Sequence, residues 1–220
     1  MAGRTEPELV VVDDPAEEAR RLFLDVAPRT FVLSGGRTPE DFYRLLAATD
    51  HAWSGVEVFF GDERCVPEDD ERSNLRMARR ALLDHVPARV HPIDGAACDA
   101  DGYERVLRER FGHRRLPPFD LAIYGLGPDG HTASLFPGRP EVEESERWVV
   151  RVPQAGLEPF VPRVTLTVPA LSGAVIGAFL VQGASKRAMV ERLLAGADIP
   201  AARLAPERLL LIADPAAAPG

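Results

Sequence analysis

The sequence has little of what marks a secreted, membrane-spanning or redox-active protein. It contains two cysteines among 220 residues, Cys65 and Cys98, and neither lies in a CxxC or metal-binding spacing. We therefore expect both to be free thiols in a reducing cytoplasm. The longest apolar runs, such as Val175–Val181, are too short to cross a bilayer, so no membrane association is expected. The segment Met1–Glu8 lacks an apolar signal core, which argues against export.

An excess of positive charge is absent as well. Aspartate and glutamate outnumber lysine and arginine by 34 to 26, which gives a formal net charge of −8. Nucleic-acid binding needs a basic face, so no such partner is expected. A small anionic ligand is not excluded, because a few local cations and helix N-termini can bind one. A hydrophobic content of 45% in a chain of this length predicts one folded domain spanning residues 1–220.

Several enzyme signatures are missing from the chain. The spacings GxxxxGK[ST] and GxGxxG do not occur, so neither a P-loop nor a dinucleotide-binding turn is predicted. No set of His, Cys, Asp and Glu has a zinc-like spacing, so no metal site is expected. Ser34 does not lie in a GxSxG elbow, which makes a serine hydrolase a poor interpretation.

What the chain does contain is a regular alternation of β-type runs and amphipathic helices. The predicted strands are Leu9–Val12, Thr30–Leu33, Val56–Phe60, Val90–Ile93, Phe119–Tyr124, Trp148–Val152, Val164–Val168, Val175–Val181 and Leu209–Ile212. The predicted helices are Ala16–Val26, one that opens at Thr38, Ser73–His85, Ala100–Phe111 and Ser185–Leu194. This alternation predicts a single-domain α/β fold with a mostly parallel sheet flanked by helices, in a Rossmann-like arrangement.

Four of these strands end in unusual residues. The segments that follow them read SGGRTP, GDER, GLGPDGHT and QGASKR. In open α/β sheets, ligands bind beyond the carboxyl ends of the strands. We therefore expect the four segments to meet at one edge of the sheet and to form one site.

The first two segments each allow two interpretations. The turn Ser34-Gly35-Gly36 runs into a helix N-terminus, where free N–H groups suit a phosphate, but it is also compatible with a plain strand–helix turn. The cluster Asp62-Glu63-Arg64 is compatible with a solvated group of charges. Its position just beyond a buried strand favours a lining of the ligand site.

The segment Gly125–Thr132 carries the sharpest candidate for catalysis. His131 lies two residues after Asp129. Histidine titrates near neutrality and can accept a proton from water, and a carboxylate beside it would orient the ring. The alternative is a structural histidine. That alternative is preferred for the other four histidines, which are His51, His85, His91 and His113.

Two further cations lie next to predicted strands. Arg163 stands before the run Val164–Val168, and Lys186 stands at the start of a helix after Val175–Val181. Either could be an ordinary surface cation. Together they could anchor a substrate anion through charge-assisted hydrogen bonds.

Taken in order, these segments resemble one family. The stretches SGGRTPEDFY, FFGDERCVPEDDERSN, FDLAIYGLGPDGHTASLFPG, PRVTLTVPAL and QGASKR are similar to the glucosamine-6-phosphate isomerase/6-phosphogluconolactonase family. The resemblance implies a glucosamine-6-phosphate deaminase-like fold. It also implies roles: His131 as general base; Asp129 and Asp62 as orienting groups; Arg64 and Asn74 as the sugar site; Lys186, Arg163 and the loop Ser34, Gly35, Gly36 as the phosphate site.

One position separates the two branches of this family. The deaminases carry a glutamate five residues after the histidine, and this chain has Phe136 there. The resemblance therefore implies hydrolysis of 6-phospho-D-glucono-1,5-lactone in the oxidative pentose phosphate pathway, by a cytoplasmic monomer or small homo-oligomer that needs no metal or organic cofactor. The alternatives are an aminosugar-phosphate deaminase or isomerase, and a non-catalytic sugar-phosphate-binding domain. Regulators of the latter kind usually carry a DNA-binding segment. The first predicted strand begins near residue 9, so no room for such a segment is expected before it.

Overall fold

A seven-stranded parallel sheet forms the centre of the molecule. The computed structural model describes residues 5–220, so Met1–Arg4, part of the segment in which no apolar signal core was found, lie outside the described residues. The strands of the sheet are β1 (Glu8–Val11), β2 (Thr30–Leu33), β3 (Glu57–Phe60), β5 (Arg89–Val90), β6 (Leu121–Tyr124), β9 (Ile176–Val181) and β10 (Arg208–Ala213). Their order is β1-β10-β9-β6-β2-β3-β5, and every pair is parallel. The predicted α/β class is confirmed.

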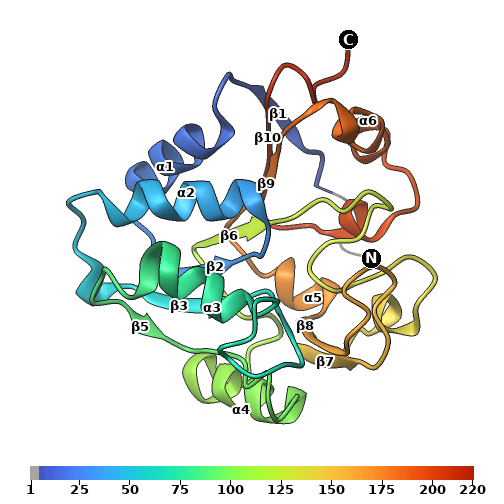
Figure 1. The fold of residues 1–220 in the computed structure, drawn as a ribbon. Helices are drawn as coiled ribbons and strands as arrows, with labels where there is room; N and C mark the ends of the chain where they lie inside the picture. Colours follow the sequence, from blue (N-terminus) through green and yellow to red (C-terminus); the bar gives the residue numbers. More distant parts are fainter. Residues whose placement is uncertain (1–4) are drawn as a thin grey trace.

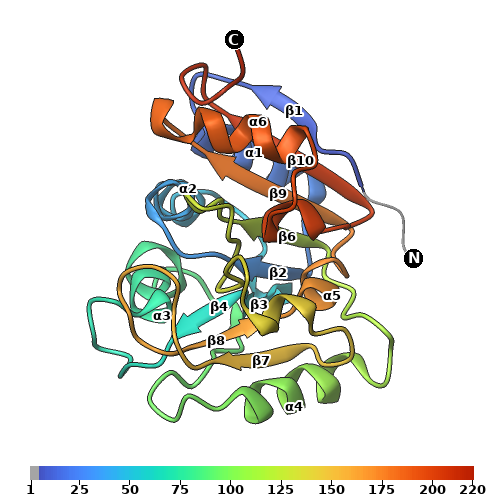
Figure 2. The same ribbon diagram turned by 90° about the vertical axis from the view of Figure 1, so that its right-hand side faces the viewer.

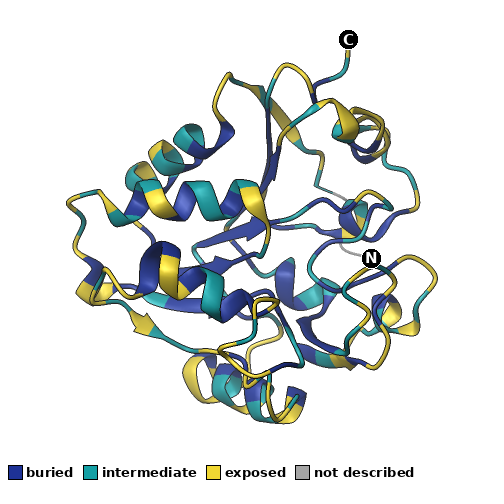
Figure 3. Cartoon of the chain, viewed as in Figure 1, coloured by how far each residue is buried: buried dark blue, intermediate teal, exposed yellow. Residues whose placement is uncertain are grey.

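Helices cover the sheet, as the alternating pattern predicted. They are α1 (Pro15–Val26), α2 (Arg37–Ala47), α3 (Asn74–Ala78), α4 (Ala100–Phe111), α5 (Val168–Leu171) and α6 (Arg187–Leu194), and a π-helical turn, Arg79–Leu83, continues α3. In Figure 1, α1, α2 and α3 lie in succession across the front of the sheet, and contacts join α1 to α2 and α2 to α3. Figure 3 shows buried strands behind helices whose outer faces are exposed.

Local sequence signals set where the helices begin. The carboxylate of Asp14 accepts hydrogen bonds from the N–H groups of Ala16 and Glu17, and Pro15 occupies the first turn of α1. Ser73 caps α3 as expected, since its hydroxyl accepts from the N–H of Arg76. Helix α2 begins at Arg37, before the Thr38 start that was predicted, and its N-cap residue makes no side-chain capping bond.

A second, antiparallel sheet was not anticipated. It consists of β4 (Asp62–Arg64), β8 (Arg163–Leu166) and β7 (Val149–Val152), in that order. The chain leaves the large sheet at Gly61, whose N–H still bonds to the carbonyl of Leu33 and whose carbonyl accepts from Leu166. Figure 2 shows this small sheet beyond β3, with α4 beyond β7. The charged cluster Asp62-Glu63-Arg64, expected just beyond a strand, is itself a strand, because β8 offers it an antiparallel partner.

The two cysteines are joined, which corrects the prediction of free thiols. A disulfide links Cys65, directly after β4, to Cys98, before α4, with their Cα atoms 4.9 Å apart. The residues are 33 positions apart in the chain, so no local spacing signals the bond. Their proximity follows from the path of the chain after β4 and before α4, which is a tertiary feature.

Reduction of this disulfide should lower the stability of the protein. The chain-entropy account gives a loss of about 3–4 kcal/mol in the free energy of unfolding for cysteines separated by 33 positions. Urea unfolding with and without a dithiol reductant measures the difference. The double variant Cys65→Ser/Cys98→Ser is the control, and its unfolding should not respond to reductant. Two titratable thiols in the folded, unreduced protein would contradict the bond.

Candidate active site

A cavity of about 770 Å³ lies at the carboxyl edge of the large sheet. Its lining includes Ser34–Gly36 after β2, Asp62 and Arg64 of β4, Gly125–Pro128 and His131 after β6, and Gln182, Gly183 and Lys186 after β9. The strands β9, β6, β2 and β3 are neighbours in the sheet. Their carboxyl ends therefore deliver the four segments singled out in the sequence to one place.

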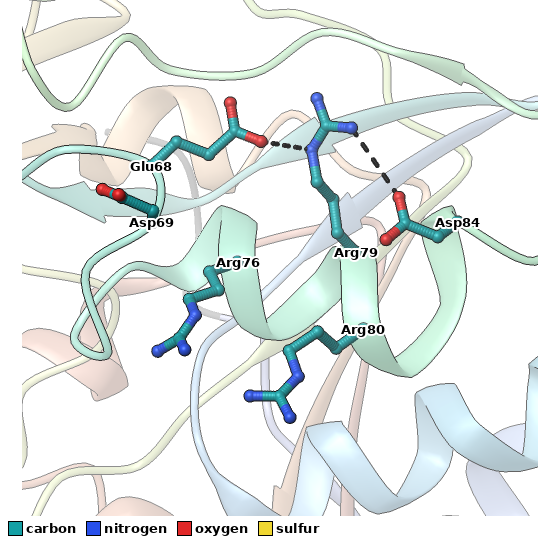
Figure 4. A pocket seen from close by; sticks show the side chains of 6 residues that line it. All are labelled: Glu68, Asp69, Arg76, Arg79, Arg80 and Asp84. Atoms are coloured by element: carbon teal, nitrogen blue, oxygen red, sulfur yellow. Dashed lines mark ion pairs between the residues drawn. The ribbon is translucent and has the colours of Figure 1, made fainter.

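Another surface pocket, of about 390 Å³, lies over α3 and the π-helical turn. Arg79 pairs there with two carboxylates, with Glu68 at 2.6 Å and with Asp84 at 3.7 Å (Figure 4). Among the six residues that line it there is no histidine, serine or glycine-rich turn. The cavity at the strand ends is consequently the better candidate for chemistry.

The turn after β6 places His131 against its own backbone. A Cβ atom at Gly127 would stand 2.0 Å from the Nδ1 atom of His131, so only glycine allows this close approach. The carbonyl of His131 accepts a hydrogen bond from the N–H of Gly127 at 2.9 Å. Gly130 adopts a φ of +88°, a conformation that side chains rarely tolerate. The glycines of the motif thus serve to bring the imidazole back over the turn.

Asp129 fixes the protonation pattern of the imidazole. The Nδ1 atom of His131 lies 2.6 Å from the Oδ1 atom of Asp129. A carboxylate can only accept, so in the neutral imidazole Nδ1 carries the proton and Nε2 has the free lone pair. The same carboxylate oxygen accepts the N–H of His131 at 3.1 Å. The arrangement therefore leaves Nε2 of the neutral ring able to accept a proton.

The glycine-rich turn after β2 is held from beneath by a tyrosine. The hydroxyl of Tyr43, a fully buried residue of α2, accepts from the N–H of Ser34 at 2.8 Å and donates to its carbonyl at 2.9 Å. Burial raises the pKa of this hydroxyl, so it stays protonated and can make both bonds. The turn meets the cavity just where α2 begins, and the first N–H groups of that helix remain available to a ligand.

Asp62 is a buried carboxylate that borders the cavity. One oxygen accepts from the hydroxyl of Ser134 at 2.5 Å and the other from the amide of Asn74 at 3.2 Å. Ser134 is fixed in turn, because its N–H donates to the hydroxyl of Thr165 on β8. Asn74 therefore lies behind Asp62 and does not line the cavity itself. Ser134 was missed in the sequence, although it stands three residues after His131.

Glu63, the next residue in the chain, holds the start of α3 rather than bordering the cavity. Its carboxylate accepts four hydrogen bonds, from the N–H groups of Arg64, Asn74 and Leu75 and from the hydroxyl of Ser73. It thereby ties the start of α3 to β4. Burial raises the pKa of this carboxyl, and the three N–H donors oppose the rise. Of the two acids in GDER, Asp62 thus borders the cavity and Glu63 belongs to the scaffold.

The predicted cations take different positions. Lys186, the only lysine of the chain, lines the cavity and donates from Nζ to the carbonyl of Leu126 at 2.6 Å. Burial lowers the pKa of its ammonium group, and the charge of Asp129 opposes that shift. Arg64 also lines the cavity, where its buried Nε atom has no hydrogen-bond partner. These two cations are therefore placed to meet an anionic ligand.

Arg163 is not part of the lining. Its guanidinium donates to the carbonyls of Val161 and Pro159, and only 4% of the residue is exposed. Burial lowers its pKa to about 10, and the negative charge of Asp62 opposes the shift. Its assignment to a phosphate stays a prediction. The cavity instead includes Arg37, a cation within the SGGRTP motif that the sequence analysis did not select.

Comparison with known proteins identifies the family of this chain. The model of a family described as glucosamine-6-phosphate isomerases/6-phosphogluconolactonase matches residues 10–212. The chain belongs to this family. A 6-phosphogluconolactonase from Synechocystis sp. is 44% identical over 169 residues, which cover 72% of this chain and 68% of that protein.

Solved structures agree with this placement. A 6-phosphogluconolactonase from Trypanosoma cruzi has a TM-score of 0.85 and 28% identity, and the match covers 98% of this chain and 97% of that one. A monomeric glucosamine-6-phosphate deaminase has a TM-score of 0.82 but only 19% identity, with coverage of 96% and 98%. The second likeness shows the fold alone. Both branches of the family share the scaffold, so the side chains have to separate them.

Phe136, the residue five positions after His131, presents an apolar ring. Phe136 is 3% exposed, and its ring centroid lies 4.8 Å from that of His131. No carboxylate can come from this position. Among residues 5–220, no group of three or more His, Cys, Asp or Glu side chains is placed to hold a metal ion. In the same part of the chain, no helix is long and apolar enough to cross a membrane.

Replacing Glu63 with glutamine should destabilise the fold. The amide NH₂ of glutamine would face donors that now bond to a carboxylate oxygen, so two buried hydrogen bonds are lost. We expect the free energy of unfolding to fall by about 2–4 kcal/mol. Urea unfolding measures this, and Glu71→Gln provides the same chemical change at a side chain that is 93% exposed. Equal transition midpoints for both variants would contradict the scaffold role.

Proposed function

We propose that the chain hydrolyses 6-phospho-D-glucono-1,5-lactone to 6-phospho-D-gluconate, with His131 as general base. The observation that carries the proposal is the bond between Asp129 and Nδ1 of His131, which leaves Nε2 as a proton acceptor in a cavity with three cations. A neutral imidazole nitrogen can take a proton from water as the water attacks. The names of the relatives at 44% and 42% identity support the same substrate.

The phosphate of the substrate would bind through the chain's own donors. Lys186 supplies a charge, and the loop Ser34–Gly36 with the N-terminus of α2 supplies backbone N–H groups. Arg163, which interacts electrostatically with Asp62, would add its charge from outside the cavity lining. Holding the phosphate at one end fixes the lactone carbonyl carbon near His131 and turns the attack of water into a positioned reaction.

The chemical steps then balance within the site. Nε2 of His131 takes a proton from water while the water oxygen bonds to C1 of the lactone, and the carbonyl oxygen becomes an oxyanion. The tetrahedral intermediate collapses, the bond between C1 and the ring oxygen breaks, and the imidazolium returns its proton to that oxygen. Asp129 stabilises the imidazolium between the two steps. The oxyanion would be stabilised by Arg64 or by N–H groups of the glycine turns.

The alternatives have less support from the site. A deaminase relay needs a carboxylate where Phe136 stands, and the ring of Phe136 is buried beside the base. A purely binding domain would not need the base geometry that Asp129 imposes on His131. Ammonia release from glucosamine 6-phosphate would favour the first alternative. Tight binding of 6-phosphogluconate without any turnover of the lactone would favour the second.

The proposal includes a place and an organisation for the enzyme. A phosphorylated metabolite as substrate favours the cytoplasm, although the disulfide removes the argument that free thiols provided. One continuous hydrophobic cluster runs from Ala16 to Ala217, which supports a single domain over residues 1–220. Every group that the mechanism uses comes from one chain, so a monomer or a small homo-oligomer would serve.

Replacing His131 with glutamine should abolish most of the catalysed rate. Loss of a general base typically lowers the rate by about 10²–10⁴. We expect kcat to fall by this factor while binding of 6-phosphogluconate remains. Acid release from the lactone, corrected for spontaneous hydrolysis, measures the rate. His113→Gln, on an exposed loop, is the matched control and should behave as the wild type. A near-normal kcat in His131→Gln would remove the base from the mechanism.

Replacing Lys186 should weaken affinity more than turnover, and its effect should depend on pH. Lys186→Ala loses a contact made equally in ground and transition states, so KM rises with little change in kcat. Burial lowers the pKa of Lys186 from the ordinary value of about 10.4. As the pH rises, the ammonium group therefore loses its charge before that value is reached. Affinity for 6-phosphogluconate should therefore fall as the pH rises toward that value.

Calorimetric titration of 6-phosphogluconate at a series of alkaline pH values tests this dependence. Lys186→Arg is the control, because a guanidinium keeps its charge across the whole range and should remove the pH dependence. If both proteins lose affinity in parallel as the pH rises, Lys186 is not the titrating anchor.

A further inference from the structure

A small hydrophobic cluster stands apart from the main core, next to the catalytic turn. It is formed by Phe136, Val152 and Ala155, with Leu157 packed against it. Phe136 belongs to the turn after β6, and the other residues belong to the end of β7 and the loop 153–158. The cluster therefore connects the base-bearing turn with a loop that none of the preceding steps uses.

Phe136 is the member of this cluster that contacts the base. Its ring centroid lies 4.8 Å from the imidazole centroid of His131, with the planes tilted by 45°. Asp129 holds the imidazole at Nδ1, and the backbone of Gly127 approaches the same ring. A packed aromatic neighbour restricts rotation of the ring further, because the ring has to keep its contact with Phe136. The position of Nε2 then depends on Phe136 as well as on Asp129 and Gly127.

The loop 153–158 holds Phe136 in place through its backbone. A Cβ atom added at Gly156 would lie 2.9 Å from Cδ1 and 3.0 Å from Cγ of Phe136. Such distances are shorter than carbon atoms accept, so the backbone at Gly156 is already in contact with the ring. Phe136 is thus fixed by a loop residue, and a change at Gly156 must move the ring or the loop.

We propose that Phe136 is a positioning residue that fixes the imidazole of His131, and that Gly156 in the loop 153–158 fixes Phe136. The inference rests on the proposed function, because it takes His131 to be the base. In the sequence, Phe136 served only to exclude a deaminase. In the structure it completes the surroundings of the base: a carboxylate at the Nδ1 edge and an apolar ring against the imidazole.

The kinetic test uses variants that shorten the side chain of Phe136 in steps, together with a substitution at Gly156 in the loop. Phe136→Ala should lower kcat by about tenfold or more, since small displacements of a catalytic group have effects of this size, while KM stays within about twofold. Phe136→Leu keeps an apolar contact and should recover part of the loss. Gly156→Ala leaves Phe136 intact but displaces its ring, and it should lower kcat severalfold with KM unchanged.

The matched control is Phe119→Leu. Phe119 is fully buried in the main core, where its ring contacts Phe59 and Phe111, and it makes no contribution to the cavity. The same chemical change there should lower stability without lowering kcat. Rates are compared below the unfolding temperature of each variant. A parallel loss of kcat in Phe119→Leu would show that loss of core packing alone explains the result.

A spectroscopic readout tests the contact without using activity. The imidazole C–H resonances of His131 are identified by their absence in the NMR spectrum of His131→Gln. The ring current of Phe136 acts on them at 4.8 Å, so they should shift in Phe136→Leu and in Gly156→Ala but not in Phe119→Leu. Unmoved resonances in Gly156→Ala would overturn the role of the loop, and unmoved resonances in Phe136→Leu would overturn the contact itself.

The two proposals fail in distinguishable ways. If His131→Gln keeps its kcat while the resonances shift as expected, the contact exists but the proposed base is wrong. If His131→Gln is inactive while Phe136→Ala, Phe136→Leu and Gly156→Ala all retain the wild-type kcat, the base stands and the positioning role is overturned. Lowered kcat with shifted resonances and an unaffected control supports both.

Discussion

Parallel pairing of β9, β6, β2 and β3 is the constraint on which the site depends. Parallel strands end at the same edge, so the segments that follow them meet although they are far apart in the chain. Reversing any one of these strands would send its loop to the opposite edge. The buried residues of β2 and β6, which lie in the middle of the sheet, make this register favourable and leave the polar chemistry to the loops.

The small antiparallel sheet separates the tasks of two neighbouring acids. Side chains along a strand alternate between its faces, so Asp62 and Glu63 meet different partners. Asp62 is held by Ser134 and Asn74 at the cavity, and Glu63 is held by four donors at the start of α3. A chain with a net charge of −8 can therefore present cations to an anionic ligand, because both buried acids already accept hydrogen bonds from the protein itself.

The surroundings of His131 combine a polar and an apolar constraint. Asp129 sets which nitrogen carries the proton, and Phe136 packs against the ring. The deaminase with a TM-score of 0.82 shows that the scaffold does not dictate the reaction. A shared fold leaves the reaction to the side chains of the site, and at this position the chain has the apolar ring of Phe136, which packs against His131.

The sequence by itself determined the strand–helix alternation, the caps at Asp14 and Ser73, and the four segments at the strand ends, because periodicity and capping act over a few residues. Only the tertiary structure decided that residues 62–64 pair with β8, that Cys65 meets Cys98, and that Arg163 is buried outside the cavity lining. It also decided that Phe136 lies between Gly156 and the base. Each of these contacts joins residues that the chain brings together from different elements or turns, and no local pattern carries that information.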